Sequence, residues 1–287
     1  MLEGVYVANV TPFRENASFS LDVAAYVAHV EWLAEQGVRG VVPFGTNGEG
    51  PSVTAEEKLR TLDRLFERDL PVEIVPTVAE STLPETLALV EALGEYPAAA
   101  VMVLPPYYFK PAPAEGLRRF YEPVIEASRH TVVLYHIPKY AVPVPEELVA
   151  ELPVWGVKDS GGDSDYTERV LATGRGVLLG TEDDLAAKLA EGPHGRPQGV
   201  ISALANFIPE RMVEMHRLAL SGDDAARELS EQLQRVRGRT KEYAAPAVLK
   251  KLAAARNGVD MGTVRPPLVP APADYHPQPV LETAGAL

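Results

Sequence analysis

A lysine at the end of an apolar run is the first residue in this chain that could do chemistry. Lys158 closes the run VWGVK, residues 154–158, and the polar segment DSGG follows it. A strand this apolar would shield the amine from water, which disfavours the ammonium and leaves a neutral amine able to attack a carbonyl. That is the requirement for Schiff-base catalysis. A lysine that reaches from a strand end into solvent is the commoner case, so the neighbouring residues must decide.

A tyrosine ends the apolar run that precedes the lysine. Tyr135 lies in VVLYHIP, which starts at Val132. If the two runs form neighbouring parallel strands, the phenol would stand next to the Lys158 amine. A phenol near an amine can move protons while a carbinolamine forms and a carbon–carbon bond breaks. A core tyrosine with one hydrogen bond is the alternative interpretation.

A glycine-rich loop follows the run at 40–44. It reads GTNGEG from Gly45, and its three glycines let the backbone approach a ligand closely. The Thr46 hydroxyl and the Asn47 amide add hydrogen-bonding groups that suit a small carboxylate. The loop is neither a Walker A motif nor GxGxxG, and a tight strand-to-helix turn without a ligand explains it equally well.

Three other groups of residues are candidates for a functional site. None of the six histidines has the spacing of a metal site, so a metal-dependent aldolase is disfavoured. The acidic run EDD from Glu182 follows a predicted strand and is interpreted as helix capping. The aromatic run YYF from Tyr107 indicates either packing or a subunit contact.

The elements that position these residues alternate along the chain. Continuous apolar runs rich in β-branched residues predict strands buried on both faces, at residues 5–10, 40–44, 72–78, 98–104, 131–137, 154–158, 176–180 and 199–203. Helical spacing separates them, at 21–36, 55–68, 82–93 and 114–128 among others. Thr54 with Glu57, and Thr82 with Glu85, have the spacing of capping boxes. Eight βα units in a row predict an α/β fold, a (β/α)₈ TIM barrel, with an open doubly wound sheet as the alternative.

The alternation of predicted strands and helices ends after the eighth βα unit. Residues 223–257 look purely helical, and a Pro-rich, irregular tail follows. We therefore expect a catalytic barrel over 1–220 and a C-terminal helical extension with a Pro-rich tail over 221–287. In such a barrel the functional side chains gather at the carboxyl ends of the strands.

Composition excludes several classes of function. The 287 residues carry 27 Lys+Arg against 40 Asp+Glu, a formal net charge of −13, so nucleic acid and anionic membranes are disfavoured as partners. The absence of cysteine excludes disulfides and thiolate sites and is compatible with a reducing compartment. The amino terminus has neither a signal peptide nor a membrane-spanning run, and we expect a cytoplasmic protein.

Taken together, the motifs resemble the dihydrodipicolinate synthase / N-acetylneuraminate lyase family of pyruvate-dependent class I aldolases. Between residues 4 and 270 the matching pieces are TPF, GTNGEGPSVTAEEK, PPYYFKP, YHIP, VKDSGG, GVISALANFIPE and RPPLVP. The resemblance implies a TIM barrel with a helical extension, assembled as a homotetramer of tight dimers. It also implies no metal or organic cofactor, because the lysine itself provides the electron sink.

The resemblance implies a role for each candidate residue. Lys158 is similar to the Schiff-base lysine, Tyr135 to the general acid/base, and Tyr108 to a relay tyrosine that reaches across the dimer interface. The residues expected to bind substrate are Thr46, which also joins the proton relay and holds the pyruvate carboxylate, Asn47 and Gly48 of the same loop, Ser160, and the backbone carbonyl of Ile201. The expected activity is carbon–carbon bond cleavage of a 4-hydroxy-2-oxo acid to pyruvate and an aldehyde.

One departure from the family pattern bears on the substrate. Dihydrodipicolinate synthases carry an arginine shortly after the YxxP motif, and here that position holds Tyr140, beside Lys139. A lysine does not reproduce a bidentate guanidinium clamp, so this condensation is disfavoured. Other motifs are similar to 4-hydroxy-2-oxoglutarate aldolases and to archaeal 2-keto-3-deoxygluconate aldolases, and these two stay open. A related hydro-lyase, and a 2-oxo acid binder without turnover, are the remaining alternatives.

Overall fold

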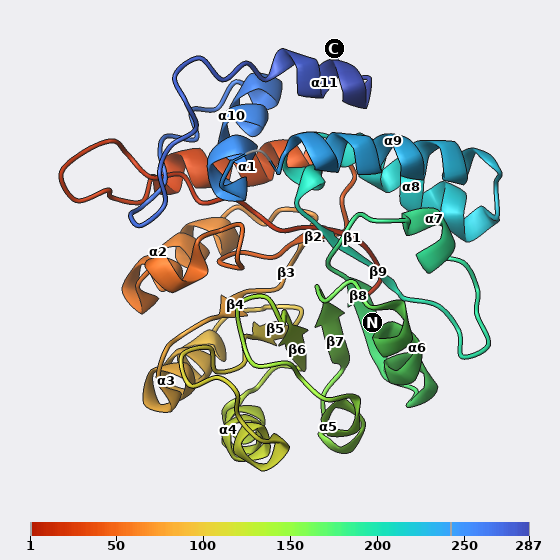
Figure 1. The fold of residues 1–287 in the computed structure, drawn as a ribbon. Helices are drawn as coiled ribbons and strands as arrows, with labels where there is room; N and C mark the ends of the chain where they lie inside the picture. The colour runs from red at the N-terminus through yellow and green to blue at the C-terminus, as the bar shows by residue number, and fades with distance from the viewer. Residues whose placement is uncertain (1, 242, 287) are drawn as a thin grey trace.

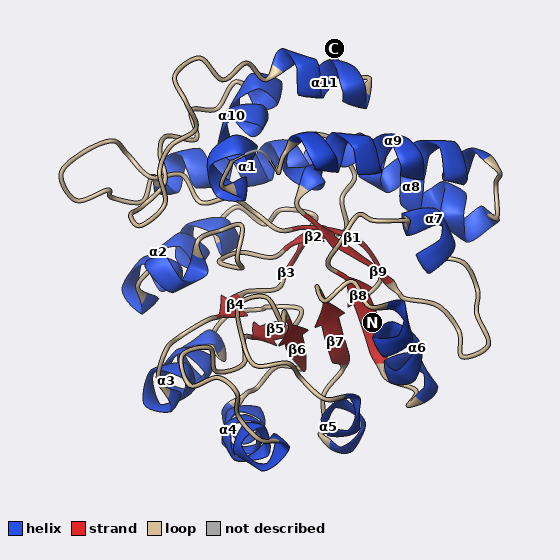
Figure 2. Ribbon diagram, viewed as in Figure 1, coloured by secondary structure: helices blue, strands red, loops and turns tan. Residues whose placement is uncertain are grey.

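The computed structural model describes residues 2–241 and 243–286, and over them the chain forms a TIM barrel with a C-terminal helical extension (Figure 1). Strands occupy the centre and helices surround them (Figure 2). The strands are β1 (Gly4–Val7), β2 (Gly40–Val41), β3 (Glu73–Ile74), β4 (Thr77–Val78), β5 (Val101–Val103), β6 (Val132–His136), β7 (Gly156–Asp159), β8 (Gly176–Leu179) and β9 (Gly199–Ser202). The predicted (β/α)₈ class is confirmed.

All strand pairs are parallel, and β1 pairs with both β2 and β9, as a closed barrel requires. The two ends of the strand order, β3 and β4, are halves of one barrel strand. Across the gap the Thr77 N–H donates to the Pro43 carbonyl over 3.0 Å, and the Met102 N–H donates to the Pro76 carbonyl over 2.9 Å. The strand is divided at Pro76 because proline has no N–H for the ladder. The open doubly wound sheet is therefore wrong.

Helices follow the strands around the barrel. They are α1 (Val23–Glu35), α2 (Ala55–Phe66), α3 (Leu83–Leu93), α4 (Ala114–Ala127), α5 (Glu146–Glu151), α6 (Ser164–Ala172), α7 (Leu185–Lys188) and α8 (Pro209–Ser221), with 3₁₀ turns η1 (Gly50–Ser52) and η2 (Leu204–Asn206). Thr54 and Glu57 form the predicted capping box, and the Thr82 side chain caps α3 by accepting from the Glu85 N–H. Within the described chain no helix combines the length and apolarity that crossing a membrane needs.

Alternate residues of the strands face opposite sides of the barrel wall. Val133 and Tyr135 belong to a cluster in the interior, whereas Val132 and Leu134 pack outward in the larger core beneath the helices. This period of two decides which side chains reach the barrel mouth.

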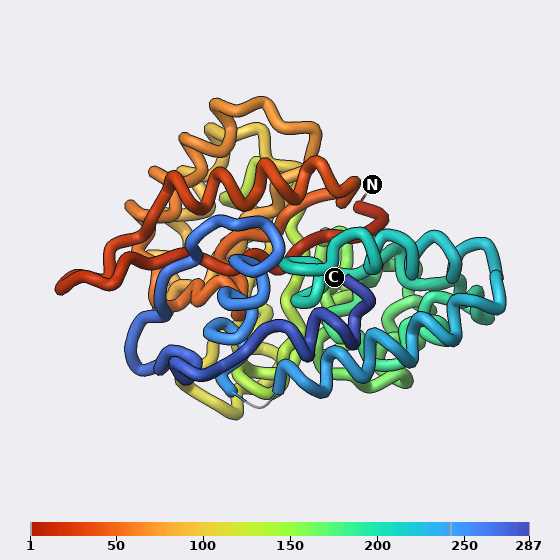
Figure 3. Tube along the Cα trace, turned by 90° about the horizontal axis from the view of Figure 1, so that it is seen from above, coloured from red at the N-terminus to blue at the C-terminus, as the bar shows by residue number. Residues whose placement is uncertain are grey.

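The C-terminal segment is divided differently from the prediction. The stretch 223–257, expected to be purely helical, contains two helices, α9 (Ala225–Arg239) and α10 (Ala245–Asn257), with a break between them, and the tail, expected to be irregular, contains a further helix, α11 (Gln278–Ala284). Pro246 explains the break, because proline is tolerated in the first turn of α10 and not inside a longer helix. Figure 3 shows the three helices as the blue part of the tube. Gln232 of α9 donates to the Thr283 carbonyl of α11, so the extension is tied together.

A buried histidine joins the extension to the barrel. His29 of α1 lies with its Nε2 3.2 Å from the Asn206 Oδ1 and its Nδ1 2.9 Å from the Asn257 Nδ2. The amide of Asn257 donates and the amide oxygen of Asn206 accepts, which requires a neutral ring with the proton on Nε2. Burial lowers the pKa of His29 to about 4, with the Asn206 contact opposing the shift.

This pKa predicts an acid-sensitive fold. The unfolded chain takes up a proton at His29 near pH 6.5 and the folded chain does not until about pH 4, so the stability contribution is complete above pH 6.5 and is lost as the pH falls. We expect the wild type to lose about 2 kcal/mol from this group between pH 7.5 and pH 5. In His29→Gln, which keeps amide contacts and cannot titrate, that part of the loss should vanish. Urea unfolding at both pH values measures it, and equal losses in the two proteins would contradict the assignment.

Candidate active site

The sheet register brings the lysine and the tyrosine together. On β6 and β7, Tyr135 is paired directly with Lys158. Val157 packs in the outer core, so its neighbour Lys158 faces the interior, as Tyr135 does. Both are almost fully buried, at 3% and 2% exposure. The Lys158 Nζ donates to the Tyr135 Oη over 3.2 Å and lies 4.3 Å from the centre of its ring.

The glycine-rich loop adds a third group to this pair. The Thr46 Oγ1 lies 3.1 Å from the Tyr135 Oη. An amine, a phenol and a hydroxyl from three separate parts of the chain therefore form one continuous hydrogen-bonded row. Such a row can pass a proton between the amine end and the loop without the help of water.

The loop that carries Thr46 has a strained backbone. Phe44 and Glu49, on either side of it, adopt φ of 61° and 53°, a left-handed conformation that side chains other than glycine rarely take. At Gly50 a Cβ atom would lie 1.8 Å from the Phe44 carbonyl oxygen, so only glycine fits. The Thr11 hydroxyl donates to the Gly48 carbonyl over 2.7 Å. The sharp fold of the loop is what turns Thr46 toward the barrel.

Behind the pair, outward-facing residues attach the same strands to α6. The Thr167 hydroxyl donates to the Asp159 Oδ2 over 2.7 Å, and the His136 ring stacks on Tyr166 with 3.9 Å between centroids. Burial lowers the pKa of His136, although the Asp159 charge opposes it. The residues that follow Tyr135 and Lys158 in sequence thus fix the strands from the opposite side.

A cavity of about 420 Å³ opens above Lys158. Of the residues predicted from the sequence, Thr46, Asn47, Tyr135, Lys158, Ser160 and Ile201 all line it. Gly48 is buried within the loop and is not part of the lining. Tyr108 is elsewhere: it is 82% exposed and packs edge-on against Phe109, which is 80% exposed. The neighbouring Tyr107 lines an adjoining cavity of about 370 Å³ that shares Thr46, Tyr135 and Tyr140 with the first.

Similarity to known proteins identifies the family of this chain. The family model described as "Dihydrodipicolinate synthetase family" matches residues 1–282. The chain belongs to this family. Curated relatives include the 4-hydroxy-tetrahydrodipicolinate synthases of Thermomicrobium roseum, 37% identical over 96% of this chain and 91% of the relative, and of Bartonella bacilliformis, 31% identical over 94% and 93%.

Solved structures agree with the fold of this family. A dihydrodipicolinate synthase from Thermotoga maritima has a TM-score of 0.88 at 29% identity and covers 100% of both chains. A variant of the Sulfolobus solfataricus 2-keto-3-deoxygluconate aldolase has a TM-score of 0.89 at 23% identity, covering 98% of this chain and 95% of the other. Solved proteins with different names thus share the fold of this chain.

The cavity of this family member is lined by two cationic side chains that sequence reasoning missed. Arg237 lies near the end of α9, and Lys241 follows in the break before α10; both line the cavity, as does Lys139. Among the described lining residues none is acidic. No local pattern distinguishes Arg237 from the other charged residues of an amphipathic helix, so only the tertiary structure reveals its position.

A buried carboxylate holds Arg237. The Glu182 Oε1 accepts hydrogen bonds from the Ser202 hydroxyl and the Ala203 N–H, each over 2.8 Å, and its Oε2 lies 3.2 Å from the Arg237 Nε. The interpretation of Glu182 as a helix cap is wrong, because α7 has Asp184 at its N-cap and no side-chain capping bond. Glu182 instead links the ends of β8 and β9 to the extension.

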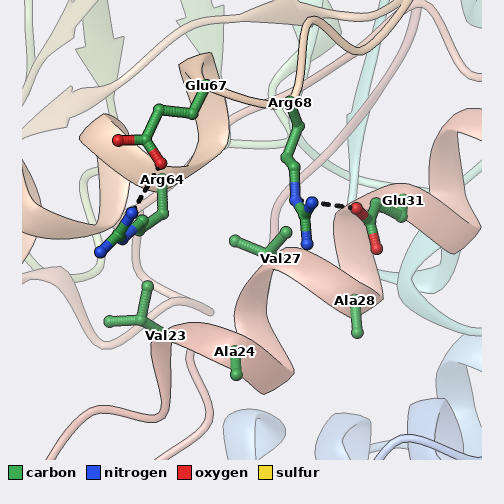
Figure 4. Close-up of a pocket in the computed structure, with 8 residues that line it drawn as sticks. All are labelled: Val23, Ala24, Val27, Ala28, Glu31, Arg64, Glu67 and Arg68. Carbon is green, nitrogen blue, oxygen red and sulfur yellow. Dashed lines mark hydrogen bonds and ion pairs between the residues drawn. The ribbon is translucent and has the colours of Figure 1, made fainter.

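A groove of about 580 Å³ outside the barrel mouth lies between α1 and α2 (Figure 4). Its floor is apolar, and its rim consists of two ion pairs, Glu31 with Arg68 and Arg64 with Glu67. It shares no lining residue with the Lys158 cavity. Across the described residues no group of histidine, aspartate and glutamate side chains is arranged to hold a metal ion.

Breaking the buried Glu182–Arg237 pair should lower the free energy of unfolding more than breaking the exposed Glu31–Arg68 pair. Glu182→Gln should destabilise the fold by about 1–3 kcal/mol, because it removes the charge opposite Arg237 and weakens a buried acceptor. Glu31→Gln removes the carboxylate of the exposed pair with Arg68, and should cost about 0–1 kcal/mol. Urea unfolding compares the two variants. Equal losses would show that the Glu182 pair is no more important than an exposed one.

Proposed function

We propose that this family member is a class I, pyruvate-dependent lyase that cleaves a 4-hydroxy-2-oxo acid to pyruvate and an aldehyde. The observation that carries the proposal is the buried Lys158 amine, 3.2 Å from the Tyr135 phenol at the floor of a cavity. A binding protein has no need for an amine removed from water beside a proton donor. Enzymes of this family act on pyruvate, and this supports the same class of reaction.

The proposed chemistry begins with attack of the Lys158 amine on the 2-oxo carbon. Tyr135 gives its phenol proton to the departing hydroxyl, which leaves as water, and a cationic imine and a phenolate remain; the Thr46 hydroxyl, 3.1 Å away, can donate a hydrogen bond to that phenolate. The imine withdraws electrons from C3, so the C3–C4 bond breaks as the phenolate accepts the proton of the 4-hydroxyl and the aldehyde departs. Tyr135 then returns this proton to C3 of the enamine, and water releases pyruvate from Lys158.

The glycine-rich loop is the proposed site for the carboxylate next to the reacting carbonyl. The backbone N–H groups around Asn47 and Gly48, with the Thr46 hydroxyl, suit one carboxylate. Ser160 and the carbonyl of Ile201 would contact the central part of the substrate. Each of these residues except Gly48 lines the cavity, which supports a direct contact.

The proposed role of Tyr108 requires a second copy of the chain. Its exposure of 82% beside the equally exposed Phe109 is costly for a free surface and supports burial in a dimer. We propose that the tyrosine then joins the relay of the partner's site, within a homotetramer of two such dimers. A monomeric synthase variant is known among the structural neighbours, so assembly varies within the family.

The cationic side chains of the cavity lining support a substrate with a second negative group. Lys139, Arg237 and Lys241 all line the cavity, in a chain whose net charge is −13. With one carboxylate held by the loop, these cations favour a distal carboxylate, as in 4-hydroxy-2-oxoglutarate, or a distal phosphate on a 2-keto-3-deoxy sugar acid. A structural neighbour, a Sulfolobus 2-keto-3-deoxygluconate aldolase, was solved in complex with D-KDPG.

A synthase-type condensation is the second candidate, because the curated relatives are named 4-hydroxy-tetrahydrodipicolinate synthases. Tyr140 at the expected arginine position argues against it. Pyruvate consumption on addition of aspartate semialdehyde, at a rate above that of cleavage, would favour the condensation. Thermal stabilisation by pyruvate without any covalent adduct would instead favour a binder without turnover.

Borohydride trapping tests the chemical step. Incubation with pyruvate and borohydride should add one reduced pyruvate unit to the chain, located at Lys158 by peptide mass spectrometry, and Lys158→Ala should abolish it. Tyr135→Phe should lower kcat by about 10²–10⁴-fold, since it removes the general acid and base. No adduct on the wild type, under conditions that trap a control aldolase, would refute the proposal.

Arg237 tests the class of substrate. Arg237→Met should lower kcat/KM about 10–100-fold for a substrate with a distal carboxylate or phosphate, because a charge-assisted hydrogen bond is lost. With 2-keto-3-deoxygluconate, whose distal end is neutral, the change should stay within about threefold. Arg239→Met, on the same helix and outside the cavity lining, is the matched control. Equal losses on both substrates would contradict a distal anion.

A further inference from the structure

A buried ion pair takes no part in the chemistry described so far; neither of its members lines the Lys158 cavity, although its acidic member, Glu49, lines the adjoining cavity of about 370 Å³. The Lys250 Nζ of α10 lies 2.5 Å from the Glu49 Oε1 and 2.5 Å from the Thr263 carbonyl oxygen. Both side chains are almost completely buried, at 2% and 1% exposure. The ammonium also lies 4.6 Å from the centre of the Phe13 ring. Burial lowers the pKa of Lys250 to about 8, and the charge of Glu49 opposes that shift.

The acidic partner belongs to the strained loop. Glu49 has a φ of 53°, and its own N–H donates to the Thr46 carbonyl over 3.2 Å. Its second carboxylate oxygen accepts the Arg265 N–H over 2.9 Å. The Glu49 carboxylate therefore accepts hydrogen bonds from the C-terminal part of the chain, whereas the backbone N–H of the same residue donates to the Thr46 carbonyl.

The segment that holds Glu49 is itself firmly anchored. The Arg265 guanidinium forms an ion pair with Glu57 of α2 and donates to the carbonyls of Phe19 and Ser52. It also lies 4.2 Å from the centre of the Phe13 ring, on which Lys250 packs as well. The extension thus presents a rigid cation to a loop that has an unfavourable backbone conformation.

We propose that Glu49 and Lys250 are positioning residues that hold the Thr46 hydroxyl within reach of Tyr135. The inference rests on the proposed function, in which that hydroxyl is part of the proton relay. Without the ammonium, the Glu49 carboxylate would be buried and unpaired, and it would move toward water. The loop would then relax from its left-handed conformation and carry Thr46 away from the phenol.

The chain offers a matched control for this proposal. Lys58 of α2 is 1% exposed and forms an ion pair with Glu80, which is 15% exposed, so Lys58→Met breaks a lysine–glutamate pair whose lysine is as buried as Lys250. That pair includes no residue of the loop. Lys250→Met should lower kcat by about 10²-fold, the effect of a small displacement of a reacting group, whereas Lys58→Met should change it by less than about threefold. Both are assayed at a temperature where circular dichroism shows them folded.

A double-mutant cycle separates positioning from a general loss of structure. Thr46→Val removes the hydroxyl, so in that background Lys250→Met should lower kcat by less than about threefold. Lys58→Met should have the same small effect in both backgrounds. If Lys250→Met costs the same factor with and without the Thr46 hydroxyl, the proposal is overturned. Should Lys250→Met fail to fold, Glu49→Gln, which keeps an acceptor and loses the charge, takes its place in the cycle.

Hydrogen exchange gives a readout that does not depend on turnover. In Lys250→Met the amides of residues 45–50 should exchange at least about tenfold faster than in the wild type, and in Lys58→Met they should not change. Unchanged exchange in Lys250→Met would overturn the proposal even with an active enzyme. If the wild type forms no pyruvate adduct, the proposed function fails while faster exchange still establishes that the pair holds the loop.

Discussion

The pairing of Tyr135 with Lys158 across two parallel strands is the constraint on which the remainder of the site depends. In a parallel sheet, residues in register face the same side, so an inward amine is necessarily beside an inward phenol. A shift of either strand by one residue would turn one of the two groups toward the helices. The barrel prevents this shift, because Val157 and Leu134 fill the outer core and Asp159 is bonded to α6.

Burial gives this pair its chemical character. The amine and the phenol are both almost completely buried, and the amine donates a hydrogen bond to the phenol. A group in such surroundings interacts strongly with any charge that develops nearby, because little water is present to screen it.

The sequence alone predicts the features that have local signals. The eight apolar runs mark the barrel strands, and a lysine, a tyrosine and a glycine-rich loop at strand ends stand out from apolar packing. Glu182 could not be interpreted correctly, because its partners Ser202 and Arg237 are distant in sequence and its exposure is decided by the fold. Pro246 carries a local signal for the break between α9 and α10, because proline belongs in the first turn of a helix, whereas helical spacing alone does not show where one helix ends and the next begins.

The residues that line the cavity come from two different parts of the chain, and this bears on how the protein can evolve. Lys158 and Tyr135 are contributed by barrel strands and Thr46 by the loop after β2, whereas Arg237 is contributed by the end of α9 and Lys241 by the residues that follow it. In the proposed function, mutations at the end of α9 would change the contacts to the substrate without changing the Lys158–Tyr135 pair. One scaffold can therefore give rise to members with different preferences through changes at the far end of the chain.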